Sequence, residues 1–310
     1  MAPNLRSPKI RQRARKKRLM TAENAKAFLI GMGEIYIFID MSIPKIIHYC
    51  WLSNDPYPEL VQRCIQSWKE KLPDYELMLW DMNHFDVHSV PWVEQACSVK
   101  KWAFAADYIR LYALYNHGGI YLDSDVEVLK SFDDLLDRPY FFGKEHTPDR
   151  IDSSHIIEAA TFGAEIHHPL IKKCLDYYAG KNFIMANGAF DTTVLPHIMA
   201  SVLNQEGALR DLLPMHYFSP KNTRTQIVEA TAETYSVHHF NGSWYSVAQR
   251  KHVNARIKFC KLFGENVGTL LSTIYAVFVN LKYNSFQDTL SRCKQKGLSL
   301  FQVKKWQSQK

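Results

Sequence analysis

Apolar positions along the chain switch between strand-like runs and helix-like spacing from residue 43 onward. Residues 43–51 form a short buried run, and the apolar positions of 58–72 recur every three or four residues before Pro73. Residues 75–80 are again strand-like. Strand, helix and strand in quick succession are typical of α/β proteins with parallel strands. We therefore expect a single α/β domain with a Rossmann-type, mixed and mainly parallel sheet.

Residues 101–116 predict a helix that is apolar on nearly all sides and ends at two glycines. Its only charged residues between 102 and 115 are Asp107 and Arg110. Because they are three positions apart, they lie on one face of the helix. Two buried charges are unfavourable unless they are paired or bound to something. Either an internal ion pair or a ligand contact would explain them.

The stretch GGIYLDSDVEV, residues 118–128, predicts a buried strand that carries an acidic end. In one continuous strand Asp123, Asp125 and Glu127 would share a face. Ligands of open α/β sheets bind at the carboxyl ends of strands. Two adjacent carboxylates repel each other unless a cation lies between them. Oxygen ligands suit Mg²⁺ or Mn²⁺, so the pattern predicts metal-assisted chemistry on a phosphate-bearing substrate.

The rest of the chain continues with mixed elements and then a basic tail. We expect strands at 139–143 and 233–244, helices at 169–178 and within 188–203, and a turn at Asn241-Gly242. The tail from 250 onward combines Lys/Arg with an apolar stretch, 268–281, that is too short to cross a bilayer. Two interpretations remain: helices on a membrane surface, or a helical pair that caps the core.

The net charge of +7 is distributed unevenly. Residues 1–40 carry nine Lys/Arg against three Asp/Glu, residues 250–310 carry twelve against two, and 41–249 have a net charge of −9. An acidic body argues against nucleic-acid binding and fits a metal site with termini that meet an anionic surface. We interpret 1–40 as a basic extension, disordered or outside the fold, 41–249 as the catalytic domain, and 250–310 as a basic helical tail. Met41 is an alternative start of translation.

The cysteines indicate the compartment. All six are widely spaced, without a C-x-x-C pair or a Cys/His metal pattern. Such spacing predicts reduced thiols and therefore a cytoplasmic protein.

Residues 103–129, AFAADYIRLYALYNHGGIYLDSDVEVL, resemble the signature of glycosyltransferases with a sugar-binding region containing a DXD motif. This family, glycosyltransferase family 32, includes fungal initiating α-1,6-mannosyltransferases and bacterial capsular-polysaccharide glycosyltransferases. IPKIIHYCW at 43–51, GAEIHHPL at 163–170 and HHFNGSW at 238–244 are similar to further family motifs. The resemblance implies a GT-A-like fold, a nucleotide-sugar donor, a divalent cation and transfer with retention at the anomeric carbon.

The resemblance also implies a metal site. Asp125 would bind the cation directly, and Asp123 would hold the ribose of the donor and reach the cation. His239 would be the third protein ligand, with His238 as the alternative. A histidine ligand favours Mn²⁺ over Mg²⁺.

Further donor contacts follow from the same resemblance. Asp107 and Arg110 would contact the donor sugar and the diphosphate, for which the planar arginine fork is well suited. The other implied nucleotide-sugar contacts are His48 and Trp51 at the first strand, Tyr121, Ser243 and Trp244 at the diphosphate, and Asn187 and Asp191 at the sugar. This chain has Gly188-Ala189 where the family has Gly-Pro, which leaves the acceptor side open.

We therefore expect a metal-dependent, retaining hexosyltransferase, with a UDP-sugar favoured over GDP-mannose. The expected acceptor is a glycan or a lipid-linked oligosaccharide at the inner face of the cytoplasmic membrane, in capsular or surface polysaccharide synthesis. One alternative is a haloacid-dehalogenase-like phosphatase, whose motif has Thr or Val where this chain has Glu127. A non-catalytic sugar- or membrane-binding relative is the other.

Overall fold

The computed structural model describes residues 42–53, 55–145, 157–242 and 247–283. The chain divides into two units, Met1–Ser42 and Ile43–Lys310. All described residues except Ser42 belong to the second unit, so the predicted N-terminal extension lies outside the described residues.

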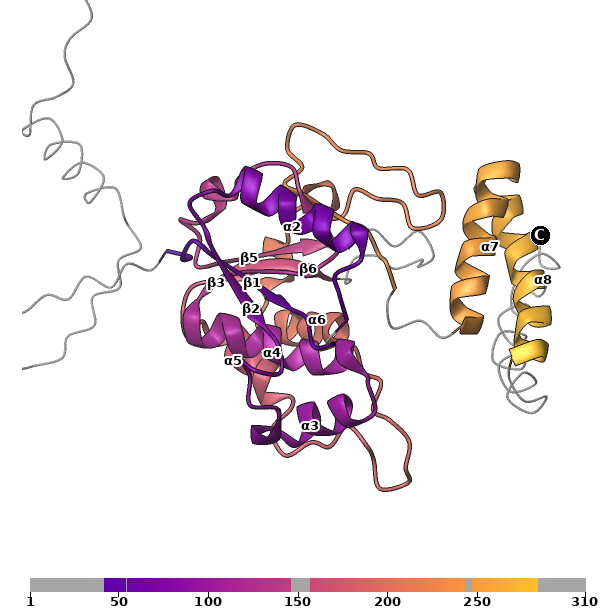
Figure 1. Cartoon of the computed structure of the whole chain (residues 1–310). Coiled ribbons are helices and arrows are strands. Elements are labelled where there is room, and N and C mark those ends of the chain that lie inside the picture. The colour runs from indigo at the N-terminus through magenta and orange to yellow at the C-terminus, as the bar shows by residue number, and fades with distance from the viewer. Residues whose placement is uncertain (1–41, 54, 146–156, 243–246, 284–310) are drawn as a thin grey trace, which may run out of the picture. The chain divides into compact units, whose positions relative to one another are not determined.

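A five-stranded sheet with the order β2-β1-β3-β6-β5 forms the centre of the fold (Figure 1). β1 pairs in parallel with both β2 and β3, whereas β6 pairs antiparallel with β3 and β5. Four strands therefore run in one direction and β6 in the other, which confirms the mixed, mainly parallel α/β sheet. The strands are β1 (Ile46–Cys50), β2 (Glu76–Trp80), β3 (Gly119–Leu122), β5 (Tyr140–Lys144) and β6 (Ile157–Ala164).

Seven helices and a two-stranded ribbon complete the described regular structure, together with short 3₁₀ turns. The predicted helices are confirmed, and α3 adds one that the sequence pattern did not indicate. The helices are α2 (Glu59–Lys71), α3 (Pro91–Ser98), α4 (Trp102–His117), α5 (Pro169–Asp176), α6 (Leu195–Gln205), α7 (Val247–Phe263) and α8 (Glu265–Tyr283). The ribbon pairs β4 (Val126–Val128) antiparallel with β7 (Ser236–His238).

Both faces of the sheet are covered, and this explains why its strands are apolar throughout. In β3, Tyr121 packs into the cluster formed with α3, α4, α5 and α6, whereas Ile120 and Leu122 pack into the cluster beneath α2. Successive strand residues point to opposite faces, so one strand supplies both halves of the core.

The connection from α4 to β3 depends on two glycines. Gly118 and Gly119 have φ values of 62° and 106°, a region that side chains rarely tolerate. A Cβ on Gly119 would lie 2.7 Å from the carbonyl oxygen of Ile46. The tight turn brings β3 directly beside β1. It thereby fixes where the carboxyl end of β3 lies relative to β1.

The late strand is shorter than the sequence predicts. Instead of residues 233–244, β7 contains three residues, because its partner β4 is equally short. Phe240, with a φ of 52°, then ends the extended conformation.

Two observations bear on the tail and the thiols. The tail is helical, with α7 beginning at Val247, and no described helix is long and apolar enough to cross a membrane. The five cysteines that the structure describes are free thiols.

Two buried histidines make the fold sensitive to acid. His168 caps α5 by accepting a hydrogen bond from the Leu170 N–H through Nδ1, at 3.3 Å. Burial lowers the pKa of His168 and of His48 to about 4, below the ordinary value of 6.5. The unfolded chain therefore binds more protons than the folded chain between these pH values, and stability falls as the pH drops through this window.

We expect the acid sensitivity to decrease when His168 is replaced by a cap that does not titrate. In His168→Asn the free energy of unfolding should lose about 2 kcal/mol less than wild type between pH 6.5 and 4. Urea unfolding across this pH range measures the effect, with the exposed His84→Asn as control. Parallel pH profiles for wild type and His168→Asn would contradict the assignment.

Candidate active site

The two aspartates of the D-x-D motif lie in a turn and not in a strand. β3 ends at Leu122, and the Val126 N–H donates to the Asp123 carbonyl at 3.0 Å. The expectation of one continuous strand with Glu127 on the shared face is therefore wrong. The turn brings the carboxylates of Asp123 and Asp125 together, and Glu127 in β4 faces elsewhere.

A histidine completes this acidic turn. Ligand atoms of Asp123, Asp125 and His238 all lie within 4.8 Å of one another. The register of β4 and β7, in which Val126 faces His238, brings the ring to the turn. Two carboxylates and an imidazole are a donor set that fits Mn²⁺ well.

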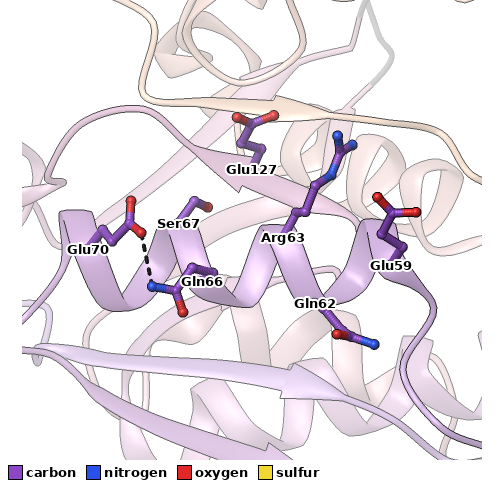
Figure 2. A pocket seen from close by; sticks show the side chains of 7 residues that line it. All are labelled: Glu59, Gln62, Arg63, Gln66, Ser67, Glu70 and Glu127. Carbon is purple, nitrogen blue, oxygen red and sulfur yellow. Dashed lines mark hydrogen bonds between the residues drawn. The ribbon is translucent and has the colours of Figure 1, made fainter.

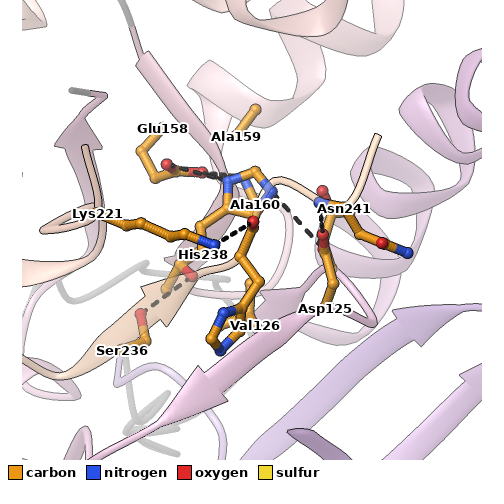
Figure 3. Close-up of polar contacts among 12 residues, drawn as sticks. Asp125, Val126, Glu158, Ala159, Ala160, Lys221, Ser236, His238 and Asn241 are labelled. Atoms are coloured by element: carbon orange, nitrogen blue, oxygen red, sulfur yellow. Dashed lines mark hydrogen bonds and ion pairs between the residues drawn. The ribbon is translucent and has the colours of Figure 1, made fainter. Parts of the chain in front are cut away.

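His238 lies between two carboxylates (Figure 3). Its Nδ1 is 3.2 Å from Glu158, and its Nε2 is 3.6 Å from Asp125. Burial lowers the pKa of His238, but the charges of Glu158 and Asp125 outweigh it and raise this pKa to about 10. Asp125 is held in turn by the Asn241 N–H at 2.7 Å.

His239 has a different environment. Its Nε2 lies 2.9 Å from Glu127, and burial lowers its pKa. Among the described residues only the His238 ring joins the aspartate pair, whereas His239, which follows the end of β7, directs its ring to Glu127. His238, the alternative named by the resemblance, therefore lies with the aspartate pair, whereas His239 does not; which of the two binds the cation stays a prediction.

We expect the two histidines to differ in metal binding. His238→Ala should weaken Mn²⁺ binding at least tenfold because it removes one of three protein ligands. His239→Ala should change the affinity less than twofold and serves as the matched control. Isothermal titration of both variants with Mn²⁺ measures this, and an equal loss in both would contradict the assignment.

Arg110 is the buried centre of a second polar group behind the turn. Its guanidinium lies 3.3 Å from Asp107 and 3.2 Å from Asp123, and it donates to the Ala159 carbonyl at 2.7 Å. It also stacks over the ring of Tyr121, 4.5 Å from the centroid. The ion-pair interpretation of Asp107 and Arg110 is thus observed, and Arg110 fixes Asp123 from the core side.

Asp107 connects this group to α6. It accepts a hydrogen bond from the Leu195 N–H at 3.2 Å, at the first residue of α6. Burial raises the pKa of Asp107 to about 6, although Arg110 acts against this shift. Tyr121, which lies in β3 two residues before Asp123, donates to Asp123 at 2.8 Å. Direct contacts of Asp107, Arg110 and Tyr121 with a donor stay predictions.

Two further expected donor contacts, His48 and Trp51, have partners of their own within the protein. His48 is fully buried within the sheet, where it accepts from the Trp80 indole and its other nitrogen faces the Gly118 carbonyl. Both ring nitrogens are thus engaged within the protein, and a contact of His48 with a donor stays a prediction. Trp51 donates to the Asp55 carbonyl at 2.9 Å and is half-buried.

Asn187 and Asp191 cap their own turns, accepting from Ala189 and Thr193 respectively. Within the described residues, no hydrogen bond or ion pair joins either of them to the D-x-D turn. Ser243 and Trp244 lie outside the described residues.

Two residues of the site were missed from the sequence. Glu158 could have been noticed as the only charged residue of an otherwise apolar strand, β6. Lys221 gave no such signal, because its place depends on a loop. Its Nζ donates to the His239 carbonyl at 2.9 Å, and it is 9% exposed. Burial lowers the pKa of Lys221, and the charge of Asp125 opposes this.

An open groove of about 530 Å³ follows α2 on the side of Glu127 (Figure 2). Its charged residues are three glutamates and one arginine, a balance that does not suit a diphosphate. We therefore do not assign the donor to this groove. The lining residues are Glu59, Gln62, Arg63, Gln66, Ser67, Glu70 and Glu127.

The fold and the site define an α/β protein with an acidic D-x-D turn, a histidine partner and a buried arginine at the carboxyl end of the sheet. Residues 58–142 match the family model "Glycosyltransferase sugar-binding region containing DXD motif". The matched region includes α4, β3 and the D-x-D turn, so the chain is similar to this family in the part that forms the site.

Curated relatives are fungal. The chain is 39% identical over 110 residues to "Inositol phosphoceramide mannosyltransferase 3" of Schizosaccharomyces pombe, covering 34% of this chain and 31% of that protein. It is 28% identical over 200 residues to "Mannosyl phosphorylinositol ceramide synthase CSH1" of Saccharomyces cerevisiae, covering 58% and 50%. The matched region thus spans about a third to a half of these relatives.

Solved structures with similarity include "PaToxG Glycosyltransferase", at 20% identity and a TM-score of 0.39, covering 53% of this chain and 69% of that one. The galactosyltransferase LgtC, in complex with donor and acceptor sugar analogs, has 13% identity and a TM-score of 0.36, covering 74% and 95%. Both TM-scores are below 0.5, so the fold assignment here depends on the strand order and helix layers of this chain.

Proposed function

We propose that this protein is a glycosyltransferase that transfers a hexose from a nucleoside-diphosphate sugar with the help of a divalent cation. The observation that carries the proposal is the convergence of Asp123, Asp125 and His238 inside a region that matches the DXD sugar-binding family. Carboxylates alone would be weak evidence, because acidic strand ends are common. The histidine and the buried arginine behind the turn make the arrangement specific.

The proposed mechanism follows from the charges that develop. Cleavage of the sugar–phosphate bond leaves negative charge on the diphosphate and positive charge at the anomeric carbon. A bound Mn²⁺ or Mg²⁺ would neutralise the leaving diphosphate. Asp123, Asp125 and His238 would hold it, while Arg110 keeps Asp123 in place. Lys221, beside Asp125, is a cation that can face the same diphosphate.

Retention at the anomeric carbon is part of the proposal. Retaining glycoside hydrolases use a carboxylate nucleophile. Glu158, a carboxylate close to the site, is fully buried and bonded to the Ala160 N–H and to His238. It is therefore a poor nucleophile, and we propose a front-face displacement in which the departing phosphate assists the attacking hydroxyl.

The relatives add information on which sugar the donor carries. We expected a UDP-hexose, whereas the names of the fungal relatives specify transfer of mannose. We propose that mannose donors and UDP-hexoses be tested together. A panel of UDP-glucose, UDP-galactose and GDP-mannose, scored for hydrolysis with and without Mn²⁺, should give one Mn²⁺-dependent activity. No turnover of any donor would favour the non-catalytic alternative, and release of free phosphate from phosphomonoesters would favour the phosphatase.

For the acceptor, we propose a lipid-linked glycan and peripheral contact with an anionic membrane surface through the tail. The names of the relatives specify a ceramide lipid, which supports a lipid acceptor. A cytoplasmic location and a role in capsular or surface polysaccharide synthesis remain proposals that depend on the resemblance to bacterial family members.

The helix pair α7–α8 supports the membrane contact. One side of α8 packs closely on α7 through small residues, since a Cβ on Gly268 would lie 2.4 Å from the Cys260 backbone. The other side exposes apolar residues, and α7 exposes cations without any acidic residue. Apolar and cationic sides of this kind are typical of membrane-surface helices. The exposed residues are Val267, Leu270, Ile274, Val277 and Phe278 on α8, and Arg250, Lys251, Lys258 and Lys261 on α7.

Vesicle flotation tests this contact. With vesicles that contain phosphatidylserine, wild type should float, and Ile274→Asp should lower the bound fraction at least fivefold by placing a charge on the apolar side. Asn266→Asp adds the same charge to an exposed polar position and should still float. Equal binding of both variants would contradict the proposal, and donor hydrolysis should be unchanged in both.

A further inference from the structure

Glu158 is an unusual residue for its position. It lies in β6, whose eight residues are all buried, and it is 0% exposed. A buried carboxylate is strongly unfavourable unless it is paired and hydrogen-bonded. The structure provides both, because Glu158 accepts from the Ala160 N–H at 2.7 Å and lies 3.2 Å from Nδ1 of His238.

The orientation of the His238 ring shows what the pairing of Glu158 with His238 can do. Nδ1 faces Glu158 and Nε2 faces Asp125, so the two nitrogens have separate partners (Figure 3). Phe240 stacks on the ring with the centroids 3.9 Å apart, and this contact further fixes the ring plane. The histidine is thus held from behind by one carboxylate while its other nitrogen faces the D-x-D turn.

A second polar contact joins β6, which carries Glu158, to β7, which carries His238. Thr161 of β6 and Ser236 of β7 lie 3.3 Å apart through their hydroxyl groups, both fully buried. The distance between Glu158 and His238 therefore depends on two strands of different sheets, β6 held by β3 and β5, and β7 held by β4. Histidines that bind metals typically donate their second N–H to such a fixed carboxylate.

We infer that Glu158 is a positioning residue that holds the proton of His238 on Nδ1 and so directs the Nε2 lone pair toward the cation between Asp123 and Asp125. This inference rests on the metal site of the proposed function. Glu158 itself touches neither donor nor cation. It acts through the orientation and tautomer of one ligand.

The chain contains a matched control for this role. Glu127 pairs with His239 at 2.9 Å, but that histidine does not face the aspartates. Both pairs join a carboxylate to a histidine of the same segment, and only one of them points at the site. Glu158→Gln and Glu127→Gln therefore make the same chemical change in two neighbouring pairs.

The test is the Mn²⁺ affinity of the full chain without nucleotide, measured by the electron paramagnetic resonance signal of free Mn²⁺. We expect Glu158→Gln to weaken binding 10- to 100-fold. Glu127→Gln should stay within twofold of wild type. Unchanged affinity in Glu158→Gln, or equal losses in both variants, would overturn the inference. Absence of Mn²⁺ binding in wild type would overturn the proposed metal site itself.

A second measurement needs no variant and covers the case in which Glu158→Gln does not fold. In wild-type protein labelled with ¹⁵N-histidine and saturated with Mg²⁺, His238 should show a protonated Nδ1 and an unprotonated Nε2. The opposite tautomer would overturn the inference. A purely structural role of Glu158 would not determine which nitrogen carries the proton.

Discussion

Replacing Asp125 by asparagine is expected to lower Mn²⁺-dependent hydrolysis of the nucleotide sugar at least 100-fold while the protein remains folded. The carboxylate contributes one of the two negative charges that face the cation site, and loss of such charge stabilisation in the transition state typically lowers the rate 10²- to 10³-fold. Asparagine keeps the shape and can still accept from the Asn241 N–H. The fold should therefore persist.

Steady-state hydrolysis of the preferred donor, with Mn²⁺ varied, measures this loss. Asp137→Asn makes the same substitution at an exposed position and should keep wild-type activity. A melting temperature near that of wild type would show that Asp125→Asn has not unfolded. Retained Mn²⁺-dependent turnover in Asp125→Asn would remove Asp125 from the mechanism.

Replacing Arg110 by methionine is expected to cause a large loss of stability. Methionine fills a similar volume, but Asp107 and Asp123 lose their counter-ion and the Ala159 carbonyl loses its donor. Removal of one partner from a buried ion pair typically lowers the free energy of unfolding by about 3–5 kcal/mol. The same substitution at the exposed Arg138 should have an effect below about 0.5 kcal/mol.

Urea unfolding of Arg110→Met, Asp107→Asn and the double variant measures the coupling. Because the two side chains belong to one network, the double variant should lose less stability than the two single losses together. A loss below about 1 kcal/mol in Arg110→Met would show that the buried network is not an important source of stability. Donor binding should weaken as well, since Asp123 would no longer be fixed.

The regular elements could be predicted because burial imposes simple patterns. α2 has one buried side, so its apolar residues follow the helical period. The strands are covered on both faces and appear as continuous apolar runs. α3 was missed although its buried residues follow the helical spacing too: Trp92, Val93, Ala96 and Cys97.

The position of the site along the chain could be predicted from the sequence, but the spatial arrangement of its residues could not. The D-x-D residues were identified, yet their turn conformation depends on contacts with β6, such as the bond from the Asp123 N–H to the Ala160 carbonyl. The choice between His238 and His239 depends on the register of β4 and β7, strands more than a hundred residues apart. Adjacent histidines are equivalent in sequence until that register is known.

Glu158 and Lys221 show the same limit. Each acts through a partner that is distant in the sequence or carried by a loop, so the sequence does not show that partner. Only Glu158 has a local signal, as the single charged residue of β6. His48 was assigned to the donor from its motif alone, and only the surrounding packing shows that both nitrogens are engaged.

A calorimetric titration of Mn²⁺ into the protein in the presence of UDP or GDP tests the proposed cation site directly. We expect a saturable heat with one of the two nucleotides, a raised melting temperature, and loss of both in Asp125→Asn. Absence of heat and of any thermal shift with both nucleotides would contradict a cation shared between the D-x-D turn and a diphosphate.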